Sequence, residues 1–293
     1  LAVDMGGTSY DFGLITNGTL NLNNEPEIAR FRLALPSIEL DSIRGGAGLY
    51  VSIDPITNRI VMGPEGAGAT PGPVCFDKGN MQPTVTDCLA INGYLNKDNF
   101  LGGKVKLNLE LAERELQTHI ADKIGLQVND AAEGILKLWL QQALEATKRA
   151  IHVRGGDVAD YVLMGYGGAG PMVLAGVSEN QPFKGVITFP FAGAFSAFGC
   201  TTTDYSHRYT RSSLFSIAHN ADEQAKQLVA DGLTKHWQDL EAEAHASFIS
   251  EGMDIEKVEY KRIAFVRYGG QLDDVEVPFD GEWTGTTENV DTL

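Results

Sequence analysis

The amino-acid sequence predicts an α/β fold in which a β-rich insertion, at about residues 20–80, interrupts a core built from residues 1–19 and 81–293. Short apolar runs separated by glycine turns fill the first part of the chain, and such runs are typical of strands. A long amphipathic pattern at 129–153 repeats apolar residues every three or four positions, as one face of a helix does. Strand-like and helix-like segments then alternate from residue 160 onward.

The first segment predicts two strands joined by a glycine turn. Leu1–Val3 and Tyr10–Ile15 are apolar, and the six residues Asp4–Ser9 lie between them. Asn17-Gly18 supplies a further hairpin signal. From residue 28 to 62, short β-like runs alternate with turns, so we expect this part of the chain to be rich in strands.

A loop rich in Gly and Pro, residues 63–79, separates these strands from the first helices. Thr84–Asp87 carries the residue types of a helix N-cap, and a helix is expected at Cys88–Leu95. Asn108–Ile124 is amphipathic. The long helix that follows is expected to end at Gly155-Gly156, because glycine is the usual residue just beyond a helix.

The last part of the chain begins with a predicted strand at Asp160–Met164 and a glycine turn at Tyr166–Gly170. A short helix is expected at Pro171–Glu179, with proline in its first turn. The remaining predicted elements are strands at 186–189, 205–216, 257–268 and 273–279, and helices at 192–203 and 222–250.

The composition limits the classes of function. Of the 293 residues, 43% are hydrophobic, which is enough for one large core or two modest ones. The formal net charge of −16 argues against nucleic-acid binding, because contact with a phosphate backbone needs clustered Lys and Arg. A phosphate group would therefore have to be held locally, by backbone amides or by a metal ion.

The cysteines and the apolar segments bear on location. The 3 cysteines form no CxxC pair, which favours a reducing, cytoplasmic environment over a disulfide framework. No run of about 18 apolar residues is present, so we expect no membrane span. The sequence opens inside an apolar run and without Met, and we therefore expect it to be a fragment of a longer chain.

The turn Asp4–Ser9 predicts a site for a phosphate group. Glycines at positions 6 and 7 let backbone N–H groups face an anion without obstruction by Cβ atoms. Thr8 and Ser9 add hydroxyl donors, and Asp4 would hold a magnesium ion through water. The alternative is an ordinary hairpin turn, and the two flanking strands favour the phosphate site. Asp4 is the first catalytic and metal-binding candidate, and Gly6, Gly7, Thr8 and Ser9 are candidates for nucleotide binding.

A second glycine turn, Gly165–Pro171, is expected between a strand and a helix. The start of a helix attracts negative charge, and glycines allow a nucleotide to lie against the backbone. Gly167, Gly168 and Gly170 are the candidates for this contact. The spacing fits neither GxGxxG nor the P-loop. A tight strand-to-helix turn without a ligand is the alternative interpretation.

Two more residues are candidates for the chemistry. Asp87 opens a predicted helix after a loop, where it would either cap the helix or act as a catalytic carboxylate on a metal or water. His207 lies in a strand-like segment and is a candidate metal ligand, with an ordinary surface or core histidine as the alternative.

Taken in order, these motifs resemble those of the hydantoinase A/oxoprolinase family, and in particular its acetone and acetophenone carboxylase branch. The resemblance runs from residue 4 to about residue 271. The matching segments are DMGGTSYD at 4–11, GPEGAGATPGP at 63–73, PTVTD at 83–87, YGGAGP at 166–171, AFSAFG at 194–199, DYSH at 204–207 and RYGGQ at 267–271.

The resemblance implies an actin-like, RNase H-like core that forms the second half of a nucleotide cleft. The first half would lie in an amino-terminal part of the same protein, so this segment alone would be inactive. ATP and Mg²⁺ or Mn²⁺ are the implied cofactors, a hydantoinase B-like subunit is the implied partner, and the substrate would be a small carbonyl compound or cyclic amide.

Three functions remain open on the resemblance. The first is phosphorylation of a carbonyl or enolate oxygen within a ketone carboxylase, and the second is ATP-dependent hydrolysis of a cyclic amide such as a hydantoin or oxoproline. Asp41 and Val173 stand where hydantoinases of the family often carry histidine, which favours the carboxylase. The third is a non-catalytic, actin-like assembly module, which the complete Asp4–Ser9 turn disfavours.

Overall fold

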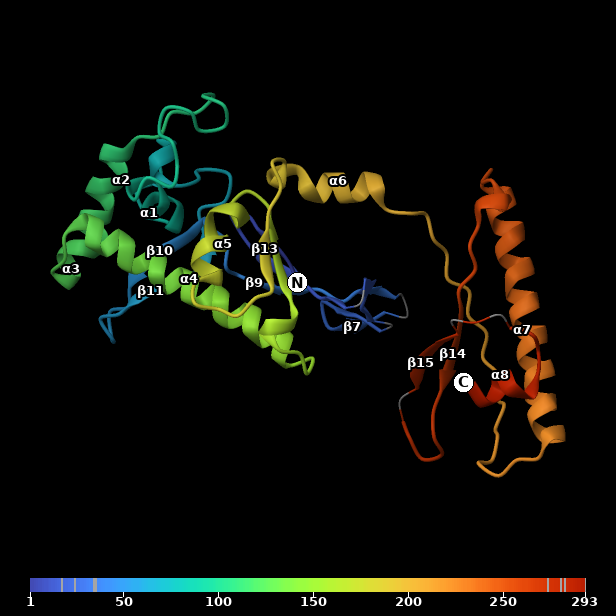
Figure 1. Ribbon diagram of the computed structural model, residues 1–293. Coiled ribbons are helices and arrows are strands. Elements are labelled where there is room, and N and C mark those ends of the chain that lie inside the picture. Colours follow the sequence, from blue (N-terminus) through green and yellow to red (C-terminus); the bar gives the residue numbers. More distant parts are fainter. Residues whose placement is uncertain are drawn as a thin grey trace. The chain divides into compact units, whose positions relative to one another are not determined.

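The computed structural model describes residues 1–293 except Asn17, Asn24, Ala34, Leu35, Asp273, Asp280, Glu282 and Leu293. Asn17 of the predicted turn and Asp273 of the last predicted strand therefore lie outside the described residues. The chain divides into two compact units, Leu1–Thr203 and Asp204–Leu293 (Figure 1). The sequence analysis placed no boundary at this point.

A five-stranded sheet with the order β13-β12-β1-β2-β9 is central to the first unit. β1 (Ala2–Met5) and β2 (Tyr10–Gly13) form an antiparallel hairpin, and β9 (Asp41–Ile43) runs antiparallel to β2. On the other side of β1, β12 (Val162–Tyr166) and β13 (Gly185–Ile187) run parallel to it. Because β1 and β12 are parallel neighbours, the turns that follow them meet at one edge of the sheet.

Alternate residues of this sheet face opposite sides, as the pleat requires. Val3 and Tyr10 are buried on the side covered by helices, and the Tyr10 hydroxyl lies 2.8 Å from Oγ1 of Thr147 in the long helix α4 (Val128–His152). Asp4 and Asp11 lie on the opposite side and are only half-buried. The sheet therefore has one packed face and one partly open face, and the open face carries two carboxylates.

Among the described residues, the first unit has six helices in addition to short 3-10 and π turns. The capping box of Thr84 and Asp87 starts α1 at Val85, three residues before the predicted helix. The predicted helix at 108–124 is interrupted by a π turn. The helix bounds are α1 (Val85–Ile91), α2 (Leu109–Leu116), α3 (Asp122–Ile124), α4 (Val128–His152), α5 (Gly170–Ser178) and α6 (Phe195–Thr202).

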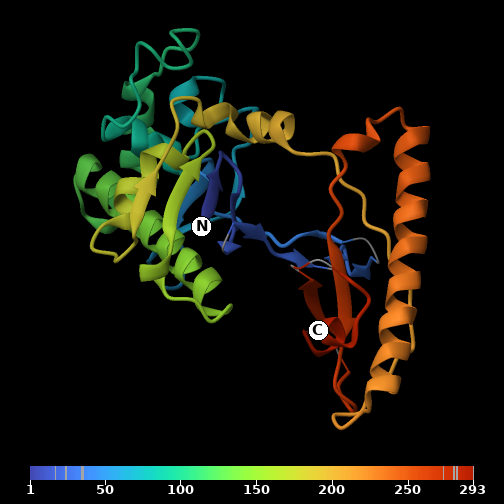
Figure 2. The ribbon, with the colours of Figure 1, turned by 45° about the vertical axis from the view of Figure 1, so that its right-hand side comes forward.

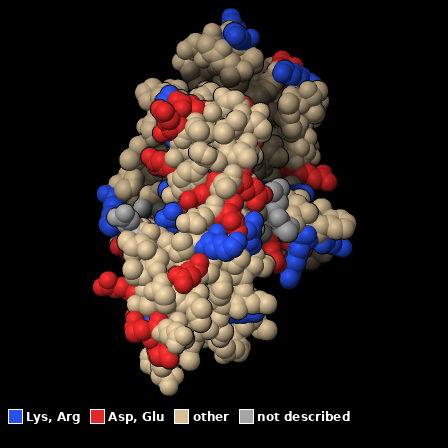
Figure 3. All heavy atoms as spheres, turned by 90° about the vertical axis from the view of Figure 1, so that its right-hand side faces the viewer, with Lys and Arg blue, Asp and Glu red and all other residues tan. Residues whose placement is uncertain are grey.

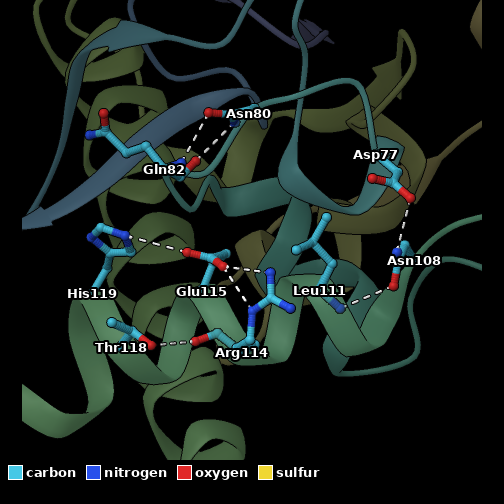
Figure 4. A network of polar contacts seen from close by, with 9 residues as sticks. All are labelled: Asp77, Asn80, Gln82, Asn108, Leu111, Arg114, Glu115, Thr118 and His119. Carbon is cyan, nitrogen blue, oxygen red and sulfur yellow. Dashed lines mark hydrogen bonds and ion pairs between the residues drawn. The ribbon is translucent and has the colours of Figure 1, made fainter.

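A polar network fixes α2, which packs against α1 (Figure 4). Asn108 caps α2 with its amide oxygen, while its amide nitrogen donates to the Asp77 carboxylate at 3.0 Å. About two turns further on, Glu115 is paired with Arg114 at 3.0 Å and with His119 at 3.5 Å. The loop before α1 is thus tied to α2.

The β-rich segment contains small antiparallel ladders. Among its described residues, β3 (Ile15–Thr16) pairs with β4 (Thr19–Leu20), β5 (Leu22–Asn23) with β8 (Ser37–Ile38), β6 (Glu27–Ile28) with β7 (Phe31–Arg32), and β10 (Leu49–Ile53) with β11 (Ile60–Gly66). The 3-10 turn Val74–Phe76 follows in the Gly/Pro-rich loop.

In the second unit, the long helix α7 (Glu223–Ser250) lies beside the hairpin of β14 (Arg262–Val266) and β15 (Val275–Phe279) (Figures 1 and 2). The short helix α8 (Thr287–Thr292) packs against α7. Trp237 of α7 meets Trp283 edge to face, with ring centroids 4.6 Å apart. Apolar contacts of this kind form the small core of the unit.

The strand predicted at 205–216 is wrong, because the segment finds no partner strand among the described residues. It is instead held by ion pairs, including Arg208 with Glu276 and Arg211 with Asp239, each at 2.9 Å. On the face drawn in Figure 3, Lys and Arg lie close to Asp and Glu, in keeping with such pairs. None of the helices in the described part of the chain has the length and apolarity needed to cross a bilayer.

Candidate functional site

The turn between β1 and β2 has an open side. Its first N–H, from Gly6, donates to the carbonyl of Ser9 at 3.2 Å and closes the turn. Among the described residues, none accepts a hydrogen bond from the N–H groups of Gly7 and Thr8. A Cβ atom built on Gly6 or Gly7 would meet nothing within 4 Å. The turn therefore presents free amides to open space, which is the geometry that an oxygen anion needs.

The other side of the turn is closed by the glycine segment 45–48. Successive N–H groups of Gly46, Ala47 and Gly48 donate to the carbonyls of residues 8, 6 and 7 at 3.3, 3.0 and 2.6 Å. A Cβ atom on Gly46 would lie 2.4 Å from the nitrogen of Thr8, so no side chain fits there. We call this segment the glycine brace. It engages the carbonyls of the turn and leaves the amides to the open side.

Two helices position the glycine brace. The indole N–H of Trp139, in α4, donates to the carbonyl of Gly45 at 2.8 Å, and both groups are buried. At the start of α1, the N–H and the hydroxyl of Thr86 donate to the carbonyl of Ala47 at 2.7 and 2.8 Å. In the sequence, residues 44–48 belong to the turns expected between the short β-like runs of 28–62. A run of glycines beside a buried tryptophan partner is a long-range feature that local patterns do not reveal.

The second glycine turn touches the end of β1. The N–H of Ala169 donates to the carbonyl of Met5 at 2.8 Å. Gly167 has a left-handed φ of 88°, and a Cβ atom there would lie 2.1 Å from Oδ1 of Asp4. Gly168 is exposed with open space beside its Cα, whereas Gly170 is buried at the first position of α5. The structure thus brings the two predicted glycine turns together at Asp4.

Asp4 is held in one orientation by its neighbours. Its Oδ1 lies against the backbone of Gly167, and its Oδ2 accepts a hydrogen bond of 2.9 Å from the hydroxyl of Ser196 in α6. Tyr166 is the register partner of Asp4 on β12, and its ring lies 4.9 Å from that of Phe195. Burial, followed by the negative charges of Asp4 and Asp11, raises the pKa of the Tyr166 hydroxyl.

Asp11 is a site residue that the sequence analysis did not select. It is the direct cross-strand partner of Asp4 on β2. Its carboxylate accepts hydrogen bonds from the hydroxyls of Ser9, at 2.7 Å, and of Ser42. The Ser9 hydroxyl predicted to face the anion is therefore directed to Asp11. A signal was present, because a hairpin centred between residues 7 and 8 pairs residue 4 with residue 11 on one face.

Two like charges directly opposite each other in a ladder are unfavourable, and a bound cation would relieve the repulsion. The described residues include no group of three or more His, Cys, Asp and Glu that could hold a metal. Mg²⁺, however, commonly binds through one or two carboxylates, with waters and substrate phosphate oxygens completing its shell. Asp4 and Asp11, beside the free amides of the turn, fit that type of site.

Asp87 has a structural role that differs from the predicted catalytic one. Its carboxylate is fully buried, and it accepts hydrogen bonds from the N–H groups of Val74, Cys75 and Thr84 at 3.2, 2.7 and 2.8 Å. The Thr84 hydroxyl adds a fourth bond at 2.8 Å. With its lone pairs engaged and no surface exposed, this carboxylate caps α1 and anchors the preceding loop. A catalytic role for Asp87 stays a prediction.

His207 belongs to the second unit, whereas Asp4 belongs to the first. Its Nε2 lies 3.1 Å from the Glu251 carboxylate, and its ring meets Phe248 edge to face. These contacts give the histidine a structural partner. Its role as a metal ligand stays a prediction.

Known families and proteins match this chain along most of its length. The hydantoinase/oxoprolinase family matches residues 1–209, and the hydantoinase/oxoprolinase C-terminal domain matches residues 220–293. The acetone carboxylase beta subunit of Xanthobacter autotrophicus is 36% identical over 275 residues, which cover 94% of this chain and 38% of that protein. The caprolactamase subunit alpha of Pseudomonas jessenii is 31% identical over 278 residues, which cover 94% of this chain and 39% of that subunit.

Two solved structures share the fold. Nucleotide-free acetone carboxylase has a TM-score of 0.81 at 35% identity, over 99% of this chain and 41% of that chain. The ATP-dependent caprolactamase from Pseudomonas jessenii has a TM-score of 0.73 at 28% identity, over 96% of this chain and 40% of that chain. This chain thus spans about two fifths of the length of these relatives. The family predicted from the sequence motifs is confirmed, and the chain belongs to the hydantoinase/oxoprolinase family.

Proposed function

We propose that the first unit contains the RNase H-like core of an actin-like ATPase and forms the second half of an ATP-binding cleft. The strand order supports this proposal, because β1, β2 and β9 are consecutive antiparallel neighbours while β12 and β13 add in parallel beside β1. The opposite wall would come from an amino-terminal part of the whole protein, and this proposal is in keeping with the chain spanning about two fifths of the length of its relatives.

The observation that carries the proposal is the meeting of the two glycine turns at Asp4. The free N–H groups of Gly7 and Thr8 would bind oxygens of the terminal phosphates, and Asp4 with Asp11 would hold Mg²⁺ or Mn²⁺ through water. Gly168, open and exposed, would let the remainder of the nucleotide lie against the backbone near the start of α5. The metal would supply charge neutralisation on the phosphates.

The reaction that we propose is transfer of the γ-phosphoryl group of ATP to a carbonyl or enolate oxygen. The bond from the γ-phosphorus to the bridging oxygen breaks, ADP leaves, and a new P–O bond forms on the substrate. Phosphoryl transfer depends on positioning and on neutralising charge more than on covalent help from the protein. The rigid turn and the paired carboxylates described above are suited to those two tasks. A hydantoinase B-like partner subunit would then complete a ketone carboxylation.

A second candidate is ATP-dependent hydrolysis of a cyclic amide, in which the amide oxygen would be phosphorylated. Water would then attack the amide carbon, phosphate would leave, and the C–N bond of the ring would break. The likeness to the ATP-dependent caprolactamase, at a TM-score of 0.73 over 96% of this chain, favours it as the alternative. A non-catalytic assembly module would not need two opposed carboxylates next to free amides.

The test uses the full-length protein with its partner subunit. We expect ATP turnover to depend on a ketone with bicarbonate for the carboxylase, and on a lactam, hydantoin or oxoproline for the amide hydrolase. Asp4→Asn should abolish turnover, whereas Asp98→Asn, at an exposed aspartate in a surface loop, is the matched control. Unchanged ATP turnover in Asp4→Asn would refute the assignment of this site.

A further inference from the structure

Helix α6, Phe195–Thr202, has an unusual environment for an apolar helix. Six of its eight residues are Phe, Ser, Ala, Phe, Gly and Cys, yet none of the eight is buried. The helix follows the 3-10 turn Ala192–Ala194 and ends next to Thr203, the last residue of the first unit. Its attachment to the rest of that unit therefore depends on few contacts.

The first of these contacts is aromatic and lies at the start of the helix. The ring of Phe195 stacks on Phe189, with centroids 4.2 Å apart and planes at 6°. Phe195 also lies beside Tyr166, the register partner of Asp4. The rings thus place the first turn of α6 next to the end of β1.

The second contact is the hydrogen bond from the Ser196 hydroxyl to Oδ2 of Asp4, at 2.9 Å. Among the described residues, no other side chain donates to the Asp4 carboxylate. The opposing negative charge of Asp11 would otherwise favour rotation of Asp4 away from it. Ser196 is therefore the group that fixes the orientation of Oδ2, while Gly167 closes the other side.

We propose that Ser196 is a positioning residue for Asp4 and that this hydrogen bond couples α6 to cation binding. The inference rests on the proposed function, because it takes Asp4 as a carboxylate that holds Mg²⁺ or Mn²⁺. Partners that orient a metal-binding carboxylate contribute strongly to affinity, and their removal commonly costs about 10–100-fold. A cation at Asp4 would also hold the carboxylate more firmly against Ser196, and so order the start of α6.

The experiment measures Mn²⁺ binding to the full-length protein with ADP, by electron paramagnetic resonance. Ser196→Ala should raise the Kd for Mn²⁺ by about 10-fold or more, and Ser196→Thr, which keeps a hydroxyl, should restore most of the affinity. Thr201→Ala is the matched control, because its hydroxyl donates to the carbonyl of Phe198 within the same helix, at 2.8 Å. It should leave the Kd unchanged.

Hydrogen exchange of the α6 amides gives a second readout. In the wild-type protein, Mn²⁺ with ADP should slow exchange at residues 195–203, and Ser196→Ala should lose that protection. If Ser196→Ala bound Mn²⁺ like the wild type while Asp4→Asn did not, the positioning role would be refuted and the proposed function would stand. If Asp4→Asn bound Mn²⁺ like the wild type, the proposed function itself would fail.

Discussion

Substitution of Gly46 by alanine tests the glycine brace, on which the shape of the phosphate turn depends. The new Cβ atom would lie 2.4 Å from the nitrogen of Thr8 and 2.5 Å from the carbonyl carbon of Gly7. These neighbours are backbone atoms, so the two segments would have to separate by roughly 1 Å to restore ordinary contact. That movement would strain the three hydrogen bonds between residues 46–48 and the turn.

The expected cost follows from these contacts. Overpacking of this kind costs about 1–3 kcal/mol, and each weakened hydrogen bond adds about 0.5–1.5 kcal/mol. We therefore expect Gly46→Ala to lower the free energy of unfolding by about 3 kcal/mol or more. For a unit of this size, each kcal/mol corresponds to about 2–4 °C, so the Tm should fall by at least about 6 °C.

Gly7→Ala is the matched control. Its Cβ would meet nothing within 4 Å, and Gly7 is not among the glycines with left-handed φ. A compatible Gly→Ala change stabilises a protein by about 0.4–1 kcal/mol, so this variant should melt at or slightly above the wild-type temperature. It should nevertheless weaken ATP binding, because the methyl group occupies the open side of the turn. If calorimetry gave Tm values for Gly46→Ala and Gly7→Ala within 1 °C of each other, the role given to the glycine brace would be refuted.

Three further outcomes are expected. Asp87→Asn should lower the unfolding free energy by about 3 kcal/mol, because one oxygen that accepts hydrogen bonds from buried N–H groups is replaced by a donor. The full-length variant should keep its ATP turnover per folded molecule. A selective loss of turnover would favour a catalytic role for Asp87. Burial raises the pKa of Tyr10 from 10.0 to about 12, so the folded state keeps its proton more tightly. The contribution of the protonated Tyr10 to the free energy of unfolding is intact below pH 10 and is lost as pH rises from 10 to 12. Urea unfolding should show that the free energy of unfolding falls by at most about 3 kcal/mol over this pH range, and Tyr10→Phe should remove most of this pH dependence. A thiol reagent should modify exposed Cys200 at once, but Cys75 and Cys88 only after unfolding, since burial raises the pKa of both thiols; rapid reaction of all three would contradict the packing.

The features that the sequence predicted well are those with strong local signals. The glycine turn predicted at residues 4–9 lies between apolar runs and is present at residues 6–9, because Asp4 and Met5 belong to β1. The long helix has an apolar stripe that extends over many turns, and it is present within one residue of its predicted bounds. The helix after 166–170 begins one residue before its predicted start, at Gly170. In each case the residues that determine the structure are neighbours in the chain.

The features that sequence patterns did not reveal depend on distant partners. The alternating pattern of side chains at 205–216 is compatible with a strand. A strand also needs a neighbouring strand, and none is present among the described residues. The sequence left Asp87 as either a cap or a catalytic carboxylate, because its donors at Val74 and Cys75 come from a loop more than ten residues earlier. The same holds for Ser196, whose hydroxyl reaches a carboxylate 192 positions away.

This long reach has a consequence for biosynthesis. The site takes its parts from residues 4–11, from 46–48, from 166–170 and from Ser196. A nascent chain therefore cannot assemble the site until the ribosome has released the segment that contains α6, and loops spanning most of the unit must close first. Ligand capture should accordingly begin late in translation, so that earlier intermediates would have to reach their native contacts without help from a bound nucleotide.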